Sequence, residues 1–219
     1  MNGKVVALLV TVAALAGAGG YYLYSQREVP TTPAPAVAEP APAPALALAA
    51  TIPDFQLADR EGQLRSLKDW QGKSLIVNFW ATWCAPCRRE IPLLQQIARE
   101  RGKDGFQVIG IAVDFRDKVI EYADQIGIDY PLLIGEQEAL DAATAFGVEA
   151  VGFPFTIFTD ARGRVILLHM GELTADEAGL ILDVVAEVNA GQLDPASARA
   201  EIEALLPALQ HGSAAKSPG

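Results

Sequence analysis

Hydrophobic residues follow three different patterns along the chain, which divide it into a membrane-like segment, a linker and a globular part. Residues 5–24 are apolar throughout and carry no charged side chain. A helix of that length extends about 30 Å, the thickness of a bilayer core. Lys4 and the amino terminus precede it with positive charge, which favours a cytoplasmic end at residues 1–4. We therefore predict a single-pass transmembrane anchor at residues 5–24.

A cleaved signal peptide is the alternative for this segment, because the small residues between Ala13 and Gly20 provide cleavage-like sites. Both alternatives export the rest of the chain. The anchor predicts a protein of the inner, cytoplasmic membrane whose catalytic domain lies on the periplasmic side. Residues 25–50 are dominated by Pro and Ala and cannot bury enough apolar surface to fold, so they are predicted to form an extended linker.

Short apolar runs alternate with amphipathic stretches beyond residue 51. The apolar runs at residues 75–81 and 106–113 are typical of strands buried on both faces. Further strands are predicted in a hairpin around residues 55–64, at residues 131–134, and in a second hairpin. The strands of that second hairpin are residues 155–159 and 164–170. Amphipathic periodicity and glycine stops predict helices at residues 86–102, 116–126, 138–146 and 174–189.

The order of these elements predicts the α/β class, with a central mixed sheet flanked by helices on both faces. The late hairpin adds antiparallel strands to an otherwise parallel arrangement. The globular domain is assigned to residues 51–190. Residues 191–219 are predicted to form a helical extension, capped by Asp194 and Pro195, and a disordered tail from His211. One stripe of this helix is expected to carry Ile202, Leu205 and Leu209.

Composition narrows the functional classes. The formal net charge of −10 disfavours nucleic-acid binding, because an acidic surface repels phosphate groups. The chain has two cysteines, and both belong to one Cys-x-x-Cys motif. This pairing excludes a scaffold held by several disulfides.

The Cys-x-x-Cys motif joins a predicted buried strand to the first turn of a helix. Free N–H groups and the partial positive charge at the helix N-terminus favour a thiolate at Cys84, which is predicted to be the attacking sulfur. Cys87 lies one turn further on, close enough to form a disulfide with Cys84. Pro86 is suited to the first helical turn, and Trp83 would provide a flat apolar surface beside the sulfurs.

Two other interpretations of the motif remain open. A zinc site would need two further ligands, and His169 and His211 are the histidines available. A purely structural disulfide is the second alternative, although so small a loop constrains little of the unfolded chain. We predict no metal site and no cofactor.

Two segments carry a resemblance to a known family. Residues 78–92, NFWATWCAPCRREIP, and residues 151–158, VGFPFTIF, resemble the TlpA/ResA-like membrane-anchored thioredoxin-like proteins of the redoxin and AhpC/TSA-like superfamily. The match covers about residues 52–189. It implies a thioredoxin-like fold and a thiol-disulfide oxidoreductase that cycles between a dithiol and a Cys84–Cys87 disulfide.

The resemblance also implies roles for individual residues. Cys84 would be the nucleophile and Cys87 the resolving thiol. Pro154 would follow a cis peptide bond, and Phe153 would offer its backbone groups to an extended substrate segment. A strand-edge proline is the alternative for Pro154. The predicted substrate-binding residues are Trp83, Phe153 and Pro154.

Asn78 and Phe155 depart from the pattern. Thioredoxin proper has a buried acid where this chain has Asn78, and an amide cannot accept the proton of Cys87. The resemblance assigns that role to Glu90, three residues after the second cysteine and on roughly the same side of the helix. A solvated surface glutamate is the alternative for Glu90. Phe155 follows the proline and is expected to make the substrate groove more apolar.

Four charged residues near the motif have less specific interpretations. Arg88 and Arg89 would either add positive potential near the thiolate or face solvent. Asp114 and Asp117 are interpreted as loop and cap residues after the second buried strand.

Four functions are compatible with these observations. The first is a reductase of exported proteins, acting on cytochrome c maturation or metal-site thiols and supplied by a membrane electron donor. An Ala-Pro dipeptide without histidine favours this reducing role. An oxidase or isomerase would use the same residues. A peroxidase is disfavoured, because Val77 and Ala81 stand where its motif requires other residues. A non-catalytic docking module would use the helix at residues 195–209, which otherwise covers the core of its own domain.

Overall fold

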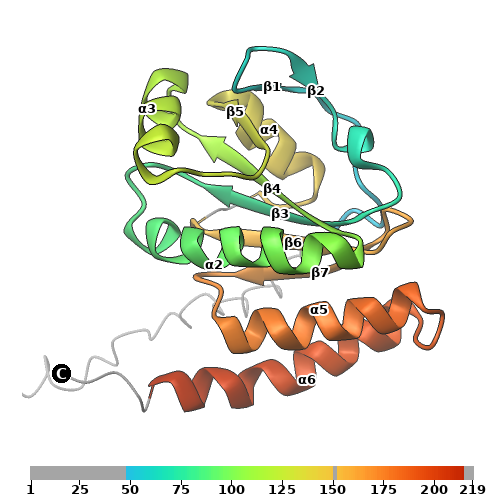
Figure 1. Ribbon diagram of the computed structural model, residues 1–219. Helices are drawn as coiled ribbons and strands as arrows, with labels where there is room; N and C mark the ends of the chain where they lie inside the picture. The colour runs from blue at the N-terminus through green and yellow to red at the C-terminus, as the bar shows by residue number, and fades with distance from the viewer. Residues whose placement is uncertain (1–47, 150–151, 215–219) are drawn as a thin grey trace, which may run out of the picture. The chain divides into compact units, whose positions relative to one another are not determined.

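The computed structural model describes residues 48–149 and 152–214 (Figure 1). The predicted anchor or signal peptide at residues 5–24 lies outside the described residues, as do most of the linker and Val151. Among the helices of the described ranges, none is long and apolar enough to cross a bilayer.

A seven-stranded mixed sheet forms the centre of the domain, in the spatial order β2-β1-β5-β4-β3-β6-β7. The strands are β1 (Leu57–Asp59), β2 (Leu64–Arg65), β3 (Ser74–Trp80), β4 (Phe106–Val113), β5 (Leu132–Gly135), β6 (Phe155–Thr159) and β7 (Val165–Met170). β3, β4 and β5 run parallel, whereas β6 pairs antiparallel with both β3 and β7. The predicted mixed sheet and both hairpins are confirmed.

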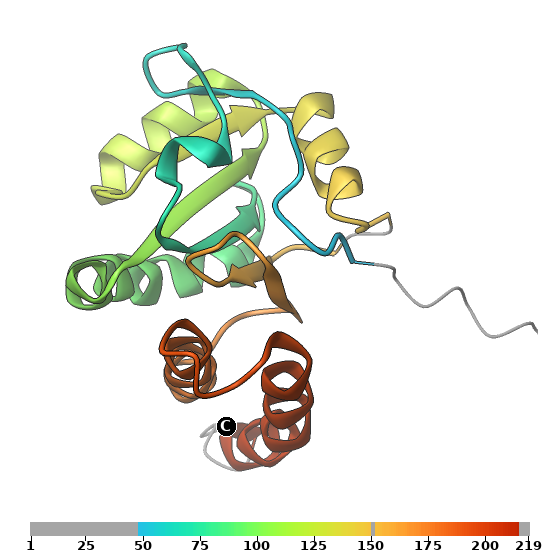
Figure 2. The same ribbon diagram turned by 90° about the vertical axis from the view of Figure 1, so that its right-hand side faces the viewer.

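Helices cover both faces of the sheet, as expected from the alternation of elements (Figure 2). They are α2 (Ala85–Arg101), α3 (Arg116–Ile126), α4 (Gln137–Ala145), α5 (Ala175–Asn189) and α6 (Pro195–Ala214), with short 3-10 turns η1 (Leu67–Trp70) and η2 (Gly102–Asp104). α2 and α3 pack on one face and α4 on the other. α5 and α6 lie beyond the β7 edge of the sheet (Figures 1 and 2).

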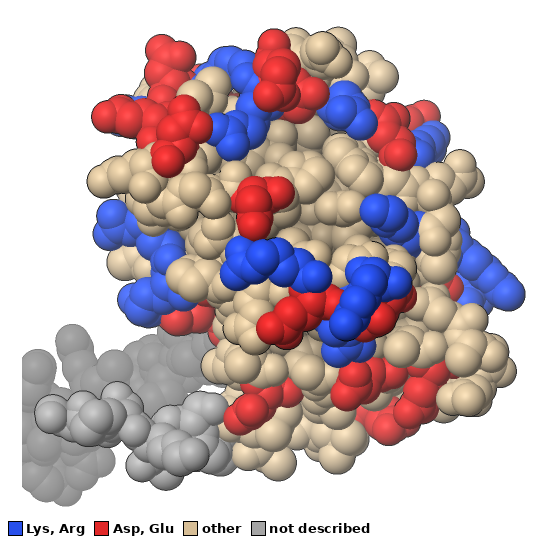
Figure 3. Space-filling model, viewed as in Figure 1, with Lys and Arg blue, Asp and Glu red and all other residues tan. Residues whose placement is uncertain are grey.

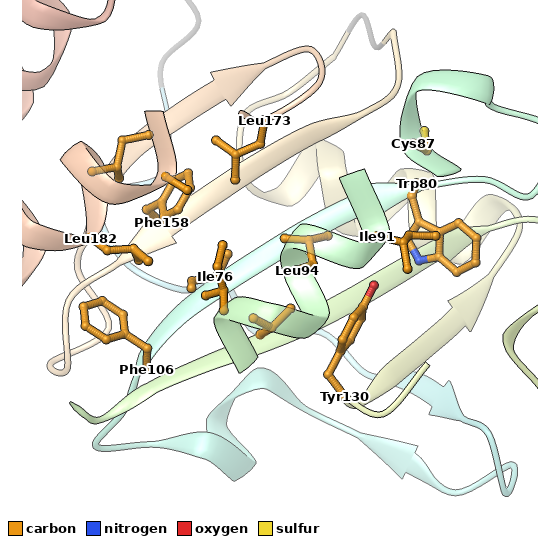
Figure 4. Close-up of a cluster of buried hydrophobic side chains, with 14 of the residues drawn as sticks. Ile76, Trp80, Cys87, Ile91, Leu94, Phe106, Tyr130, Phe158, Leu173 and Leu182 are labelled. Atoms are coloured by element: carbon orange, nitrogen blue, oxygen red, sulfur yellow. The ribbon is translucent and has the colours of Figure 1, made fainter. Parts of the chain in front are cut away.

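Two hydrophobic clusters form the core, one on each face of the sheet. β3 and β4 are buried on both faces and contribute alternate side chains to the two clusters. The larger cluster lies between the sheet and α2, α3, α5 and α6 (Figure 4). It includes Cys87 together with Trp80, Ile91 and Leu94, so one end of this cluster reaches the redox motif.

Local signals set the ends of several elements. Ser66 begins η1 by accepting the Lys68 N–H. α3 ends at Gly127, whose positive φ of 69° favours glycine. Asp194 accepts the Ala196 and Ser197 N–H groups at the start of α6, which confirms the predicted cap.

The C-terminal helix differs from its prediction in two respects. α6 continues to Ala214, so the expected disorder from His211 is wrong for residues 211–214. Ala198 and Ile202 are buried in the larger cluster, and Leu206 packs against it. Leu205 was expected on this stripe but is 44% exposed, because the buried face follows a spacing of four residues here. The helix covers the core of its own domain.

Acidic side chains predominate over α5 and α6 on the face shown in Figure 3. Lys and Arg side chains are interspersed with Asp and Glu over the rest of that face. This distribution agrees with the net charge of −10.

Candidate active site

Cys84 and Cys87 form a disulfide where β3 passes into α2. The S–S distance is 1.98 Å and the Cα atoms are 5.3 Å apart. Cys84 is the N-cap residue of α2, and its sulfur accepts the Cys87 N–H at 3.3 Å. Cys84 is 5% exposed and Cys87 is fully buried. A partner can therefore reach the sulfur of Cys84 more readily than that of Cys87.

The position of Cys84 also favours its thiolate. The free N–H groups and positive dipole end of α2 meet at this residue, so a negative charge on its sulfur is stabilised after reduction. The preceding loop is held by Asp114, which accepts the Thr82 N–H at 3.3 Å and the Thr82 hydroxyl. Asp114 therefore fixes the chain two residues before the nucleophile.

Trp83 and Phe153 form an apolar surface beside the disulfide. Trp83 is 68% exposed, and its ring meets that of Phe153 edge-on at 6.0 Å between centroids. The Phe153–Pro154 peptide bond is cis. Gly171 donates its N–H to the Pro154 carbonyl at 2.9 Å, which connects this loop to the end of β7.

Phe155 does not line the groove as expected. Its side chain is fully buried and stacks between the rings of Phe79 and Phe153, at 4.5 and 6.1 Å. Successive strand residues point to opposite faces, so Phe155 enters the core. Phe153 is the aromatic residue that is half exposed beside the site.

Glu90 is buried on α2 one turn beyond Cys87, and the surface-glutamate alternative is wrong. The residue is 2% exposed. Its Oε2 accepts the Leu173 N–H at 2.8 Å, and its Oε1 accepts a hydrogen bond from Asn78 Nδ2 at 2.7 Å. Burial raises the pKa of Glu90 to about 7, although both hydrogen bonds lower it. A carboxyl with this pKa can exchange a proton near neutral pH.

Asn78 orients the Glu90 carboxyl from β3. Its amide also donates to Thr156 Oγ1 on β6 at 3.0 Å, and both side chains are fully buried. The amide therefore acts as a fixed donor to the carboxyl. Its Oδ1 has no hydrogen-bond partner among the described residues.

Two further buried polar residues, His169 and Glu177, lie beyond Thr156. His169 on β7 is the register neighbour of Thr156. The imidazole Nε2 lies 3.3 Å from Glu177 Oε1, and Gln210 of α6 donates to the same oxygen at 3.1 Å. His169, on which the zinc alternative depended, therefore faces Glu177, and both cysteine sulfurs belong to the disulfide. Sequence reasoning did not find the Glu177 and Gln210 contacts.

Arg88 and Arg89 occupy different environments. Arg88 is exposed, whereas Arg89 forms an ion pair with Glu172, with Nε lying 3.0 Å from Oε2. Leu173, the residue after Glu172, is the backbone donor to Glu90. No pattern in the sequence indicated these contacts, which join segments 83 residues apart.

Comparison with known proteins assigns the family. The model of the AhpC/TSA family matches residues 48–167. The chain belongs to the AhpC/TSA family. Thiol-disulfide oxidoreductase ResA of Geobacillus thermodenitrificans is 33% identical over 129 residues, covering 58% of this chain and 72% of ResA. Thioredoxin-like protein YneN of Bacillus subtilis is 29% identical over 181 residues, covering 81% of this chain and 94% of YneN.

Solved structures agree with this AhpC/TSA assignment. A thiol:disulfide interchange protein of the thioredoxin family from Chlorobium tepidum has a TM-score of 0.54 and 30% identity, covering 64% of this chain and 94% of its own. A secreted thiol-disulfide isomerase from Corynebacterium glutamicum has a TM-score of 0.55 and 29% identity, covering 64% and 85%. This AhpC/TSA protein is a ResA-like thiol-disulfide oxidoreductase with a thioredoxin-like fold, as its sequence predicted.

Proposed function

We propose that this protein reduces disulfides in exported protein partners, from a periplasmic position and tethered to the inner membrane by residues 5–24. The observation that carries the proposal is the asymmetry of the motif. Cys84 lies at the accessible, positive end of α2, whereas Cys87 is buried one turn before the Glu90 carboxyl. These positions suit an attacking thiolate and a resolving thiol whose proton has an acceptor.

The reaction begins from the reduced protein. The Cys84 thiolate attacks one sulfur of the partner's disulfide, and the other partner sulfur leaves as a thiolate. Cys87 then loses its proton and attacks Cys84 Sγ, which releases the second partner sulfur. The partner gains two electrons and the Cys84–Cys87 disulfide forms, which is the state observed here.

Glu90 is the proposed acceptor of the Cys87 proton. Its pKa of about 7 allows the carboxylate to take up a proton at neutral pH and to release it afterwards. The hydrogen bonds from Leu173 and Asn78 hold the carboxyl in place between these states.

Trp83, Phe153 and Pro154 are the proposed substrate-binding residues. The rings of Trp83 and Phe153 are in contact, and Pro154 follows Phe153 through the cis peptide bond. An extended partner segment would pair with the backbone at Phe153 and contact the two aromatic rings. In this proposal, the apolar surface would hold the partner's disulfide against Cys84.

A reductase must itself be reduced after each cycle, so we propose a dithiol donor in the membrane. The proposed partners are exported proteins whose cysteines must be kept reduced. They include proteins of cytochrome c maturation and proteins with metal-site thiols. The resemblance to ResA-like proteins supports this class, and the Ala-Pro dipeptide without histidine supports the reducing direction.

A disulfide-forming oxidase or isomerase is the second candidate. The solved relative from Corynebacterium glutamicum is described as a secreted thiol-disulfide isomerase. Such an enzyme would use the same two cysteines and differ in reduction potential.

The reduction potential of the Cys84/Cys87 pair decides between the candidates. It would be measured in the full chain in detergent by equilibration with a dithiol buffer. A value near or below roughly −270 mV, that of thioredoxin, supports the reductase. A value near roughly −120 mV, that of DsbA, overturns it in favour of disulfide formation.

A further inference from the structure

The turn between β7 and α5 is tied to α2 at two consecutive residues. Arg89 contacts Glu172 through its Nε, at 3.0 and 3.1 Å from the two carboxylate oxygens. Glu90, the next residue on α2, accepts the N–H of Leu173, the next residue of the turn. The two connections therefore lie side by side, one exposed and one buried.

The same turn reaches the loop that carries the cis-proline. Gly171 donates its N–H to the Pro154 carbonyl, and Glu172 and Leu173 follow immediately. On the other side, Thr174 begins α5 with a reciprocal capping box to Glu177. The turn is thus fixed at both ends. Between them, Leu173 packs its side chain into the larger core cluster, while Glu172 and the Leu173 N–H contact α2.

We propose that Arg89 and Glu172 are positioning residues for Glu90, because their ion pair holds the turn against α2 and keeps the Leu173 amide on the Glu90 carboxylate. The inference rests on the proposed role of Glu90. It assigns a function to a surface ion pair that contributes little to stability by itself.

The physical consequence concerns the charged form of Glu90. A backbone N–H that donates to a carboxylate stabilises its charge, so loss of that contact makes the carboxyl harder to ionise. Other groups near Glu90 are Cys87 on the same helix, Tyr130 before β5 and Glu172 itself. Tyr130 stays neutral, because burial raises the pKa of its hydroxyl.

Single substitutions of the pair would mix two effects. Removal of Arg89 alone leaves the negative charge of Glu172 unbalanced near Glu90, and removal of Glu172 alone deletes that charge. The double variant Arg89→Ala/Glu172→Ala removes one positive and one negative charge together. The Glu172 charge raises the pKa of Glu90, so its loss by itself would lower that pKa. A rise in the pKa of Glu90 in the double variant therefore reports a displaced Leu173 amide.

The test follows the Leu173 amide by NMR in the full chain, labelled with ¹⁵N-leucine and held in detergent micelles. In the unmodified protein, this amide signal should titrate with Glu90. The double variant is expected to raise the titration midpoint by on the order of half a pH unit and to speed hydrogen exchange at Leu173. The charge swap Arg89→Glu/Glu172→Arg should restore slow hydrogen exchange at Leu173.

Arg99 and Asp129 provide a matched control, because they form another exposed ion pair between α2 and a loop, at 3.0 Å. Arg99→Ala/Asp129→Ala should leave the Leu173 titration unchanged. An unchanged rate of hydrogen exchange at Leu173 in the Arg89/Glu172 double variant would overturn the positioning role. The outcome is separable from the proposed function, since Glu90→Gln would test proton transfer in the exchange reaction without reference to the Leu173 amide.

Discussion

At the scale of single residues, Glu90 is expected to control the pH dependence of thiol-disulfide exchange. Glu90→Gln keeps the size of the side chain but removes its ability to accept the Cys87 proton. We expect the pH transition near 7 to disappear from the rate of disulfide exchange, and the rate at pH 7 to fall roughly a hundredfold. The measurement is the reduction rate of a disulfide-containing peptide between pH 5 and 9.

The control for this substitution is Glu100→Gln, a glutamate on the same helix that is exposed. It should leave the pH profile unchanged. If the Glu90 variant retained the profile of the unmodified protein, Glu90 would have no part in proton transfer.

The two cysteines should behave differently when substituted. Cys87→Ser leaves the accessible sulfur of Cys84 free to attack but removes the thiol that resolves the product. This variant is expected to accumulate a mixed disulfide with a partner peptide, visible by mass spectrometry of the unreduced protein. Cys84→Ser retains only the buried sulfur and should form little adduct. Equal adduct formation by both variants would contradict the assignment of Cys84 as nucleophile.

The sequence located these residues better than it described their surroundings. The family resemblance selected Glu90, and its spacing from Cys87 agreed, because residues three apart share a side of a helix. Its buried carboxylate accepts the N–H of Leu173, which is 83 residues away in sequence. No local pattern specifies such a contact, so the choice between a buried carboxyl and a surface glutamate required the three-dimensional structure.

At the scale of elements, α6 is expected to contribute to the stability of the redox domain. Ile202 is fully buried against the core, and Ile202→Ala should lower the free energy of unfolding by about 2–4 kcal/mol through the cavity it leaves. Leu205→Ala on the same helix should cost much less, since Leu205 is partly in solvent. Urea unfolding of the oxidised protein measures both. Equal losses would mean that α6 does not pack as described.

The long buried elements were predictable and the short or extended ones were less so. β4 was predicted at its observed bounds, because a continuous apolar run of this length is typical of a strand buried on both faces. η1 was not predicted, since four residues capped by Ser66 carry too little periodicity. The end of α6 was placed too early because polar and small residues there resemble a tail.

At the scale of the whole molecule, a row of buried polar side chains extends from α2 across the sheet to the C-terminal helix. Asn78 on β3, Thr156 on β6 and His169 on β7 are register neighbours and therefore point to the same face. Glu90 meets one end of this row and Glu177 the other. The two carboxylates also accept the backbone N–H groups of consecutive residues at the start of α5. Glu90 accepts that of Leu173, and Glu177 accepts that of Thr174.

The two carboxylates should affect the stability of the molecule in opposite ways as pH changes. Burial raises the pKa of Glu90 from 4.5 to about 7, so between these values the folded protein holds a proton that the unfolded chain has lost. Stability therefore falls as pH rises through this window, by on the order of 3 kcal/mol for this group. The cost is complete above pH 7 and absent below pH 4.5.

Glu177 provides the matched comparison. Burial acts to raise its pKa, but the hydrogen bonds from Thr174 and Gln210 outweigh it and lower the pKa. Its contribution to stability is therefore present above its unfolded value of 4.5 and is lost as pH falls through the lower folded value. Relative to the unmodified protein, Glu90→Gln should gain stability from pH 4.5 to 8. Glu177→Gln should lose stability as pH rises from acid to neutral. Urea unfolding of both oxidised variants across this range measures the difference, and a pH-independent difference for Glu90→Gln would show that its carboxyl ionises as in water.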